Sequence, residues 1–279
     1  MTNWKAVASN AVSWSVRFSG WWKIFLNRAG LYTSPFSLRV RGTSKKYWVG
    51  DTDAEVLDEY YCCGEYDAVN WSAFDTVVDV GSHIGVIPVN AHKYVEKVIC
   101  YEPHPATYNL LRQNIVENGI HNVSTYNKAV AAESGEVYLH ESETSLGHSI
   151  VTPFDGETLA VEATTLQQIV FCHDLDGRTL LKLDCEGAEF SIIANSSESL
   201  QAFDGILIEY HCEAGEPERL VQHLRSAGFT LHKKVTGEGR GLLYAGDIGL
   251  VADSRSSGIL TALEQTEEVD YDKERGVLW

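Results

Sequence analysis

The sequence predicts an α/β fold built on a mostly parallel sheet, and two observations support this prediction. Apolar runs that suit strands buried on both faces alternate along the chain with segments of helical periodicity. Several of these runs also carry an acidic residue at or just after their carboxyl end. Because the carboxyl ends of parallel strands meet at one edge of a sheet, these acids should line one ligand crevice.

Length and composition set the expected organisation. With 279 residues, 44% hydrophobic and 22% charged, the chain can bury a full core. We expect a basic, tryptophan-rich helical extension with a hairpin over residues 1–55, a main domain over 56–250 and an acidic tail over 251–279. The six cysteines form no metal-type C-x-x-C pair and no signal-peptide pattern is recognisable, which favours a reduced, cytoplasmic setting.

Charge is distributed unevenly along the chain, whose net charge is -17. Residues 1–50 hold eight basic side chains and no acid, whereas the rest holds 14 basic and 39 acidic side chains. Because phosphate backbones are bound by clustered Lys and Arg, the acidic body disfavours nucleic acid as a partner. The basic helix at residues 4–28 suits peripheral contact with the cytoplasmic face of a membrane; the alternative is that it packs on the core or on another subunit of a homo-oligomer.

Helical and extended segments precede the sheet. Apolar residues at three- and four-residue steps over residues 4–28 predict one amphipathic helix, which would kink at Ser19-Gly20. Alternating residues at 36–40 and 46–49 predict a hairpin, and residues 53–61 predict a helix.

Three strands and two helices are expected next. A buried strand at residues 76–80 leads into a tight turn and a helix at 85–94. The segments that follow are a strand at 98–101, a helix at 107–118 ended by Gly119 and a third strand at 124–130.

The second half of the chain continues the alternation of strands and helices. After a short strand at 136–140 comes a long polar loop at 141–155, which we expect to cover the substrate because such loops are often functional. The remaining elements are a strand at 161–164 leading into a short helix, buried strands at 179–183 and 205–210, a helix at 218–227 and strands at 229–235 and 241–245. The acid-rich end of the tail is expected to be mobile or solvated.

The glycine-containing loop at residues 79–85 indicates the kind of cofactor. Its D-x-G-x-x-x-G pattern lacks the dinucleotide spacing G-x-G-x-x-G, because His83 stands where the second glycine would be. This favours a cofactor with a ribose and no pyrophosphate over the alternative of an NAD(P)-dependent oxidoreductase. Glu102, at the end of the next strand, is placed to accept hydrogen bonds from both ribose hydroxyls. Helix capping or a salt bridge for Glu102, and close packing for the glycines, are the structural alternatives.

Several motifs together resemble the FkbM family of S-adenosylmethionine-dependent methyltransferases. They are residues 76–85, Tyr101-Glu102-Pro103, residues 127–130, residues 182–189 and Ile208-Glu209, and the K-x-D-x-E-G-A-E block at 182–189 is the most distinctive. The resemblance spans roughly residues 56–235. It implies a class I methyltransferase (Rossmann-like) fold: a seven-stranded, mostly parallel sheet with one antiparallel strand and helices on both faces. The N-terminal helical extension lies outside it.

The resemblance also implies an activity and a donor site. The expected reaction is O-methylation of a hydroxyl or carboxylate of a saccharide, such as a lipid-linked glycan, or of a similar polar metabolite. The expected cofactor-binding residues are Asp79, Gly81, Ser82, His83 and Gly85 at the methionine end, Glu102 at the ribose, and Asn127 or the backbone of Lys128 beside the adenine.

Methyl transfer at a sulfonium requires an aligned acceptor oxygen and a group that removes its proton. The candidate bases are Asp184, His211 and Glu186, all at strand ends of the predicted crevice. A non-catalytic glycan-binding or scaffold protein of the same fold is the remaining alternative. It predicts damaged crevice acids, whereas these acids are intact.

A metal ion is an alternative to a general base. Asp184, Glu186 and Glu209 form an all-oxygen cluster that suits Mg²⁺, and this arrangement resembles metal-dependent O-methyltransferases of the same fold. The competing interpretation is an ion pair of Lys182 or Arg178 with one of these acids.

Overall fold

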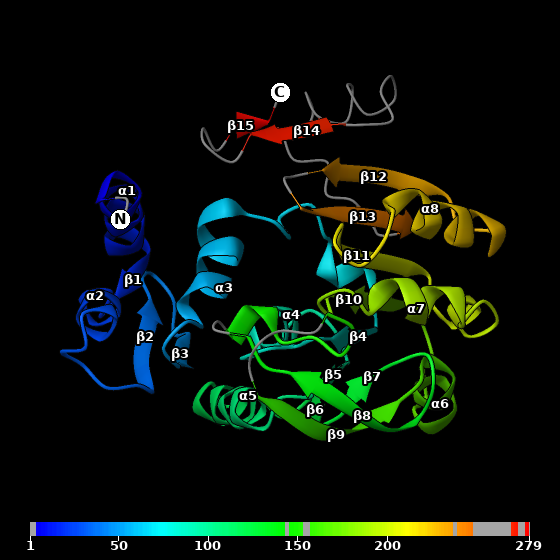
Figure 1. Ribbon diagram of the computed structural model, residues 1–279, viewed down its shortest axis with the longest axis horizontal. Coiled ribbons are helices and arrows are strands. Elements are labelled where there is room, and N and C mark those ends of the chain that lie inside the picture. The colour runs from blue at the N-terminus through cyan, green and yellow to red at the C-terminus, as the bar shows by residue number, and fades with distance from the viewer. Residues whose placement is uncertain are drawn as a thin grey trace.

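A nine-stranded sheet runs through the centre of the molecule (Figure 1). The computed structural model describes residues 4–142, 145–152, 157–236, 239–247, 269–272 and 277–278. The strand order is β15-β14-β12-β13-β11-β10-β4-β5-β6. In chain order, these strands are β4 (Thr76–Val80), β5 (Lys97–Tyr101), β6 (Val123–Tyr126), β10 (Thr179–Leu183), β11 (Gly205–His211), β12 (Leu231–Thr236), β13 (Arg240–Gly246), β14 (Val269–Asp272) and β15 (Val277–Leu278).

The strand directions confirm the predicted class I methyltransferase fold. Strands β6, β5, β4, β10 and β11 are parallel to one another, and β13 lies antiparallel between β11 and β12. The predicted count of seven strands is two short, because β14 and β15 extend the sheet beyond β12. Both come from the tail, whose acid-rich sequence we expected to be mobile or solvated.

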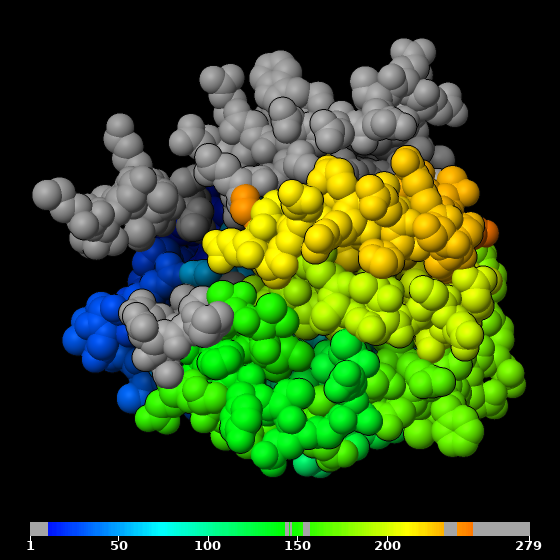
Figure 2. Space-filling view, turned by 45° about the vertical axis from the view of Figure 1, so that its right-hand side comes forward, coloured from blue at the N-terminus to red at the C-terminus, as the bar shows by residue number. Residues whose placement is uncertain are grey.

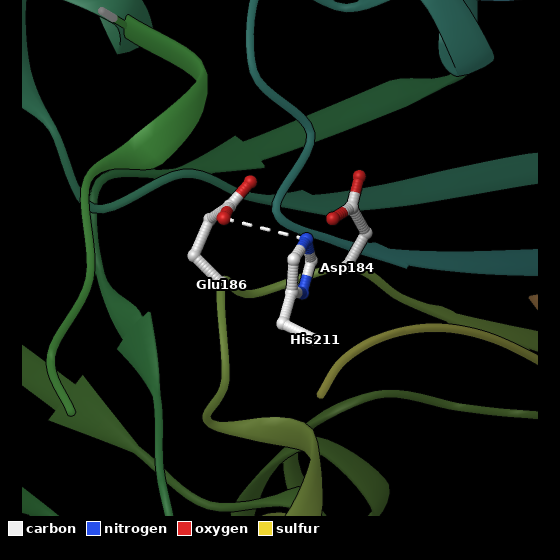
Figure 3. Close-up of side chains that lie close together, drawn as sticks. All are labelled: Asp184, Glu186 and His211. Carbon is white, nitrogen blue, oxygen red and sulfur yellow. Dashed lines mark ion pairs between the residues drawn. The ribbon is translucent and has the colours of Figure 1, made fainter. Parts of the chain in front are cut away.

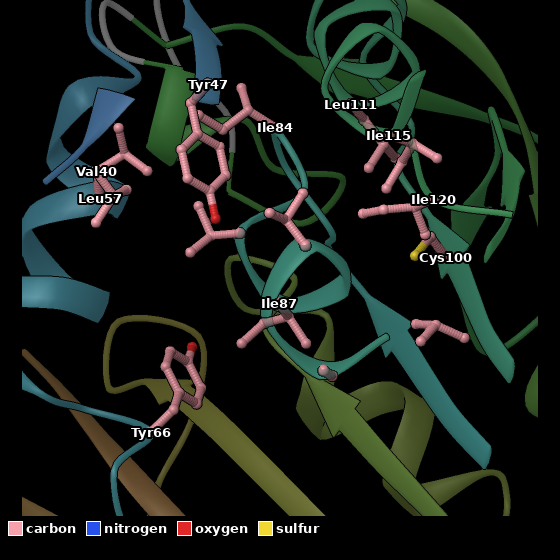
Figure 4. Close-up of a cluster of buried hydrophobic side chains, with 14 of the residues drawn as sticks. Val40, Tyr47, Leu57, Tyr66, Ile84, Ile87, Cys100, Leu111, Ile115 and Ile120 are labelled. Carbon is pink, nitrogen blue, oxygen red and sulfur yellow. The ribbon is translucent and has the colours of Figure 1, made fainter. Parts of the chain in front are cut away.

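Helices cover both faces of the sheet, as predicted. Val77 of β4 packs into one core and Val78 into the other, because successive side chains of a strand point to opposite faces. The first core, shown in Figure 4, contains α4 and α5, and the second contains α6, α7 and α8. These helices are α4 (Val86–Ala91), α5 (Pro105–Glu117), α6 (Leu166–Cys172), α7 (Glu189–Ala194) and α8 (Pro217–Ser226).

The N-terminal extension differs from the single helix that we predicted for residues 4–28. Helix α1 (Trp4–Arg17) ends where β1 (Phe18–Ser19) pairs with β2, and α2 (Trp22–Arg28) begins after Gly20, whose φ is 87°. The break lets Phe18 and Ser19 form strand hydrogen bonds that a continuous helix would not allow. The predicted hairpin is present as β2 (Phe36–Val40) and β3 (Lys46–Val49).

The apolar face of this extension packs on the first core. Trp14, Phe18 and Ile24 are all at most 2% exposed and belong to the same cluster as the residues under the main sheet. The hairpin is followed by α3 (Ala54–Asp58), which continues into a π-helical turn at Glu59–Cys63. In Figure 2 the blue N-terminal surface forms one edge of the molecule, beside the green surface of the central chain segment.

The third strand predicted at residues 124–130 is divided between two sheets. Its first part is β6, whereas β7 (Ala129–Val130) pairs with β9 (Thr158–Thr164) in a smaller sheet that also contains β8 (Gly135–His140). The chain leaves the main sheet because the Asn127 amide nitrogen donates to the backbone oxygens of Glu102 and Pro103, at 2.9 and 2.8 Å. The turn carries Lys128 to the edge of the sheet where the cleft lies.

The predicted acidic tail lies outside the described residues except for β14 and β15. Within the part of the chain that is described, no helix combines the length and apolar character needed to cross a membrane. The six cysteines, all of which lie in that part, are free thiols.

Candidate active site

A cleft opens at the carboxyl ends of β4, β5, β10 and β11, where the sequence predicted a ligand crevice. The space between its walls is about 1010 Å³, open solvent at its mouth included. The loops after the four strands form its floor, and Val56, Glu59, Tyr60 and Tyr66 form one wall. The cleft therefore draws on the predicted motifs and on the segment that precedes them.

The two glycines of the loop allow close packing against different parts of the molecule. Gly81 lines the cleft with φ of 72°, and a Cβ there would lie 1.7 Å from the backbone oxygen of Asp184. Gly85 does not line the cleft; a Cβ there would lie 2.6 Å from a methyl carbon of Leu111. Gly81 thus lets the loop rest on the end of β10, and Gly85 lets α4 pack against α5.

Ser82 and His83 occupy the loop between these glycines. The Ser82 hydroxyl donates to the backbone oxygen of Asp79 at 2.8 Å. His83 has φ of 48°, and its Nε2 lies 3.4 Å from Oδ1 of Asp53. Burial alone would raise the pKa of Asp53, but the hydrogen bond and charge of His83 lower it to about 2. The loop is therefore fixed to the N-terminal side of the molecule by a carboxylate–imidazole pair.

Glu102 lies at the end of β5, 6% exposed and lining the cleft. Its Oε2 accepts a hydrogen bond from the backbone N–H of His83 and its Oε1 one from that of His104, both at 2.9 Å. Burial raises the pKa of Glu102, while the nearby His83 opposes this shift. Each carboxylate oxygen keeps a second lone pair, so the group can still accept bonds from two hydroxyls. This geometry fits the expected ribose contact.

The remaining wall on this side is mostly apolar. Lys128 lines it, and its ammonium group lies 2.5 Å from the Glu162 carboxylate. Asn127, which is predicted to lie beside the adenine, uses its amide to hold the backbone after β5. The apolar lining residues are Pro103, Ala129, Val130, Leu139 and Ile150.

Asp79 lies beneath the cleft and not in its wall. It is completely buried, and its Oδ1 lies 3.4 Å from Nζ of Lys182. Lys182 also donates to the backbone oxygen of Gly81 at 3.0 Å and to Asp184 at 3.3 Å. Burial would lower the pKa of Lys182, but Asp184 and Asp79 raise it above its ordinary value. The ion pair considered as an alternative to a metal is therefore present.

Asp184, Glu186 and His211 converge at the other end of the cleft (Figure 3). One ligand atom from each lies within 4.8 Å of the others, and Glu186 Oε2 is 3.3 Å from His211 Nε2. Burial and the charge of Asp184 raise the pKa of Glu186 to about 8. Burial would lower the pKa of His211, but Glu189 and Glu186 raise it to about 10. Near neutral pH, His211 is therefore a cation, and the neighbouring Glu186 is mostly in its protonated form.

Glu189 is a residue that our sequence analysis did not single out. It is fully buried and accepts hydrogen bonds from the backbone N–H groups of Cys185 and Gly187, at 2.7 and 2.9 Å. Its Oε1 also lies 3.5 Å from Nδ1 of His211. Glu189 therefore holds in place both the turn after β10 and the imidazole of His211. The sequence did contain a signal for this role, since Glu189 is the last acid of the K-x-D-x-E-G-A-E block.

Glu209 has a different partner from the one expected. Its Oε1 accepts a hydrogen bond from Arg240 at 2.6 Å, and the same guanidinium donates to Glu59 at 2.7 Å and to Glu65 at 3.3 Å. The structure therefore groups His211, and not Glu209, with Asp184 and Glu186. Arg240 was missed because its partners are up to 181 residues away in the sequence.

The polar loop predicted to cover the substrate contributes Ser145, His148 and Ile150 to the cleft. The Ser149 hydroxyl donates to the backbone oxygen of Glu186 at 2.6 Å, and the Ser145 N–H donates to the Thr52 hydroxyl at 2.8 Å. Residues 143–144 and 153–156 of this loop lie outside the described residues. The described part is therefore attached on both sides of the cleft.

A family match and a relative of known activity both indicate a methyltransferase. Residues 79–231 match the family described as the methyltransferase FkbM domain. The hexuronic acid methyltransferase AglP of Haloferax volcanii is 21% identical over 205 residues, which cover 72% of this chain and 84% of that protein.

Similar solved structures include two methyltransferases. The ribosomal protein L11 methylase of Lactobacillus delbrueckii subsp. bulgaricus has a TM-score of 0.41 and 12% identity, covering 72% of this chain and 82% of that chain. Magnesium protoporphyrin IX methyltransferase of Synechocystis PCC 6803 has a TM-score of 0.41 and 10% identity, covering 69% of this chain and 78% of that chain.

Proposed function

The chain belongs to the methyltransferase FkbM domain family and is a methyltransferase, and from this premise we propose that it transfers a methyl group from S-adenosylmethionine to an oxygen of a saccharide or similar polar metabolite. One observation carries the proposal: a single cleft joins the Glu102 carboxylate to the Asp184–Glu186 pair. The name of the relative from Haloferax volcanii supports a saccharide acceptor. The acceptor group is a hydroxyl or a carboxylate.

The residues on the donor side fit S-adenosylmethionine. Bound there, this cofactor would supply a methyl group on a positively charged sulfur and leave S-adenosylhomocysteine as product. Glu102 would accept bonds from the ribose hydroxyls, and the apolar wall would face the adenine. The backbone of the Gly81–His83 turn would hold the amino-acid end. Asp79 would act from below by holding Lys182 and the loop in place.

Glu186 is the group best suited to remove the acceptor proton. General bases work best with a pKa near the operating pH, and that of Glu186 is about 8. Glu186 would accept the proton of the acceptor hydroxyl when that oxygen receives the methyl group. His211, held as a cation by Glu189, stabilises the ionised form of Glu186.

A divalent cation such as Mg²⁺ is a second way to activate the acceptor, and the Asp184–Glu186–His211 group is where it would bind. Binding there would compete with Lys182 and with the protonated imidazole, both of which already neutralise these acids. We therefore propose that the ion pairs are sufficient and that the reaction proceeds without added metal.

The N-terminal extension supports a further proposal, that the enzyme works in the cytoplasm at a membrane surface. Val12, Val16, Trp22 and Leu31 are each at least 47% exposed, in a segment that holds only basic charge. Substituting Val16 and Trp22 together by Ser should reduce co-sedimentation with anionic vesicles, whereas the exposed Phe171 on α6 offers a matched control. Unchanged sedimentation of the double variant would contradict the proposal.

Calorimetry and product analysis test the proposed function. S-adenosylhomocysteine should bind with micromolar or better affinity, and NAD should not bind. Incubation with S-adenosylmethionine and a glycoside pool should add 14 mass units to an acceptor, at an oxygen. Binding of NAD in place of S-adenosylhomocysteine, or methylation at nitrogen or carbon only, would contradict the proposal.

A further inference from the structure

A second group of side chains lines the cleft beyond the proposed base and has no part in the methyl-transfer step described above. We call it the Arg240 cluster; it consists of Arg240, its carboxylate partners Glu59, Glu65 and Glu209, and the stacked rings of Tyr60 and Tyr66. All of these except Glu65 line the cleft together with Asp184 and Glu186. The cluster therefore faces the place where an acceptor must lie.

Arg240 is already engaged by the protein. Its guanidinium donates to Glu209, Glu59 and Glu65 at 2.6, 2.7 and 3.3 Å. A carboxylate from outside would have to displace one of these partners from a half-buried site. Arg240 is thus an internal counterion that fixes three carboxylates. Their combined negative charge exceeds the single positive charge of its guanidinium group.

The other cations of the cleft are engaged as well. Among the described residues that line it, Lys182 is paired with Asp79 and Asp184, and Lys128 with Glu162. No lysine or arginine side chain of this lining is therefore left over to receive an anionic acceptor. Burial, followed by the charge of Asp184, raises the pKa of Glu209, which lines the same part of the cleft.

The aromatic pair adds a surface of a different kind. The rings of Tyr60 and Tyr66 lie 5.9 Å apart between centroids and are inclined by 24°. Burial and the surrounding acids, Glu209 first, raise the pKa of Tyr66, so its phenol stays an O–H donor. Apolar ring faces beside fixed carboxylate acceptors match a molecule that has both C–H faces and hydroxyl groups.

Building on the proposed function, we propose that the Arg240 cluster is the acceptor subsite and that it selects uncharged polyhydroxyl acceptors over anionic ones. Glu59 and Glu209, held by Arg240, accept hydrogen bonds from acceptor hydroxyls, and the tyrosine pair contacts the ring. An acceptor carboxylate is disfavoured because it meets several carboxylates and no free cation, so this inference narrows the two proposed acceptor groups to a hydroxyl. Arg240 acts here as a positioning residue, since it works through Glu59 and Glu209.

Matched glycosides provide the first test. In the presence of saturating S-adenosylhomocysteine, binding is measured by calorimetry or saturation-transfer NMR for methyl β-D-glucopyranoside and methyl β-D-glucuronide, and for the corresponding galactose pair. We expect each neutral glycoside to bind at least tenfold more tightly than its uronate at low salt, and the ratio to shrink as salt is added. Equal binding, tighter binding of the uronates or binding of neither class would overturn the inference.

Charge-removing variants provide the second test. Glu59→Gln should lower the neutral-to-uronate affinity ratio by about fivefold or more, whereas Glu55→Gln, an exposed acid that pairs with Arg28 outside the cleft, should leave it unchanged. Arg240→Met should weaken binding of both glycoside classes while S-adenosylhomocysteine affinity stays within twofold. If Arg240→Met fails to fold, Glu59→Gln alone decides, and an unchanged ratio in that variant overturns the inference. Loss of S-adenosylhomocysteine binding in the unaltered enzyme would overturn the proposed function as well.

Discussion

The donor and acceptor sides of the cleft are built in different ways. On the donor side, Glu102 is fixed by two backbone N–H groups, and Gly81 rests directly on the backbone of Asp184. On the acceptor side, Arg240 and His211 hold their acids through ion pairs between side chains. Backbone contacts tolerate few substitutions, whereas a network of side-chain charges can be rearranged by single changes. We therefore expect substitutions at the backbone contacts of the donor side to cause large losses of stability or binding. Substitutions of single charges on the acceptor side should cause smaller, graded changes.

The largest effect is expected where the donor side depends on backbone contact. Gly81→Ala places a Cβ 1.7 Å from the Asp184 oxygen at a positive φ, so we expect a loss of about 3 kcal/mol or more in unfolding free energy. Gly119→Ala is the matched control: φ is 66° and nothing lies within 4 Å, so it should cost only about 1 kcal/mol. Denaturant unfolding measures both, and equal losses would show that the contact does not matter.

Removing one charge on the donor side should preserve the fold and weaken binding of the cofactor. Glu102→Gln keeps the shape of the side chain but loses charge-assisted hydrogen bonds, each worth about 1.5–3 kcal/mol. We expect S-adenosylhomocysteine affinity to fall about tenfold to a hundredfold in calorimetry. Glu162→Gln, whose carboxylate lies outside the cleft lining and pairs with Lys128, is the control and should bind normally. Normal binding by Glu102→Gln would place the ribose elsewhere.

The titration of Glu186 and His211 on the acceptor side should determine the pH dependence of the rate. Glu186 must lose its proton to act as a base, so kcat/KM should rise with pH up to its pKa of about 8. The cationic His211 that stabilises it is lost above its pKa of about 10, so the rate should fall again there. Glu186→Gln should reduce the rate and remove the lower limb. A wild-type rate that is flat between pH 6 and 8 would exclude Glu186 as the base.

The smallest effect is expected from metal removal. Because Lys182 and His211 already neutralise Asp184 and Glu186, a chelator should change kcat less than twofold. Dialysis against EDTA followed by a methyl-transfer assay measures this, with re-addition of Mg²⁺ as the control. Loss of activity that Mg²⁺ restores would show that a cation, and not the ion pairs, completes the acceptor side.

The same contrast explains what the sequence could predict. The strand at Thr76–Val80, the role of the glycine loop and the position of Glu102 follow from local patterns, because each depends on residues close together in the chain or on neighbouring strands. Arg240 and its link to Glu59 could not be predicted, because the two residues meet only after the sheet has formed. Grouping Glu209 with the metal cluster followed from strand ends alone, and the strand ends do not show where a side chain finds its counterion.

The break in the N-terminal helix had the same origin. The apolar periodicity of residues 4–28 is satisfied by two helices as well as by one, since both bury Trp14 and Ile24. The choice is made by the pairing of Phe18 with Val40 of β2, a contact between separate chain segments that periodicity does not report.

The place of β13 in the sheet has a consequence for how the enzyme is assembled during synthesis. This strand is the last of the core elements to leave the ribosome, yet it inserts between β11 and β12 and brings Arg240 to Glu59 near the other end of the chain. The donor half can collapse around β4 and β5 long before that moment. The residues of the donor side are therefore synthesised before Arg240, which completes the acceptor side.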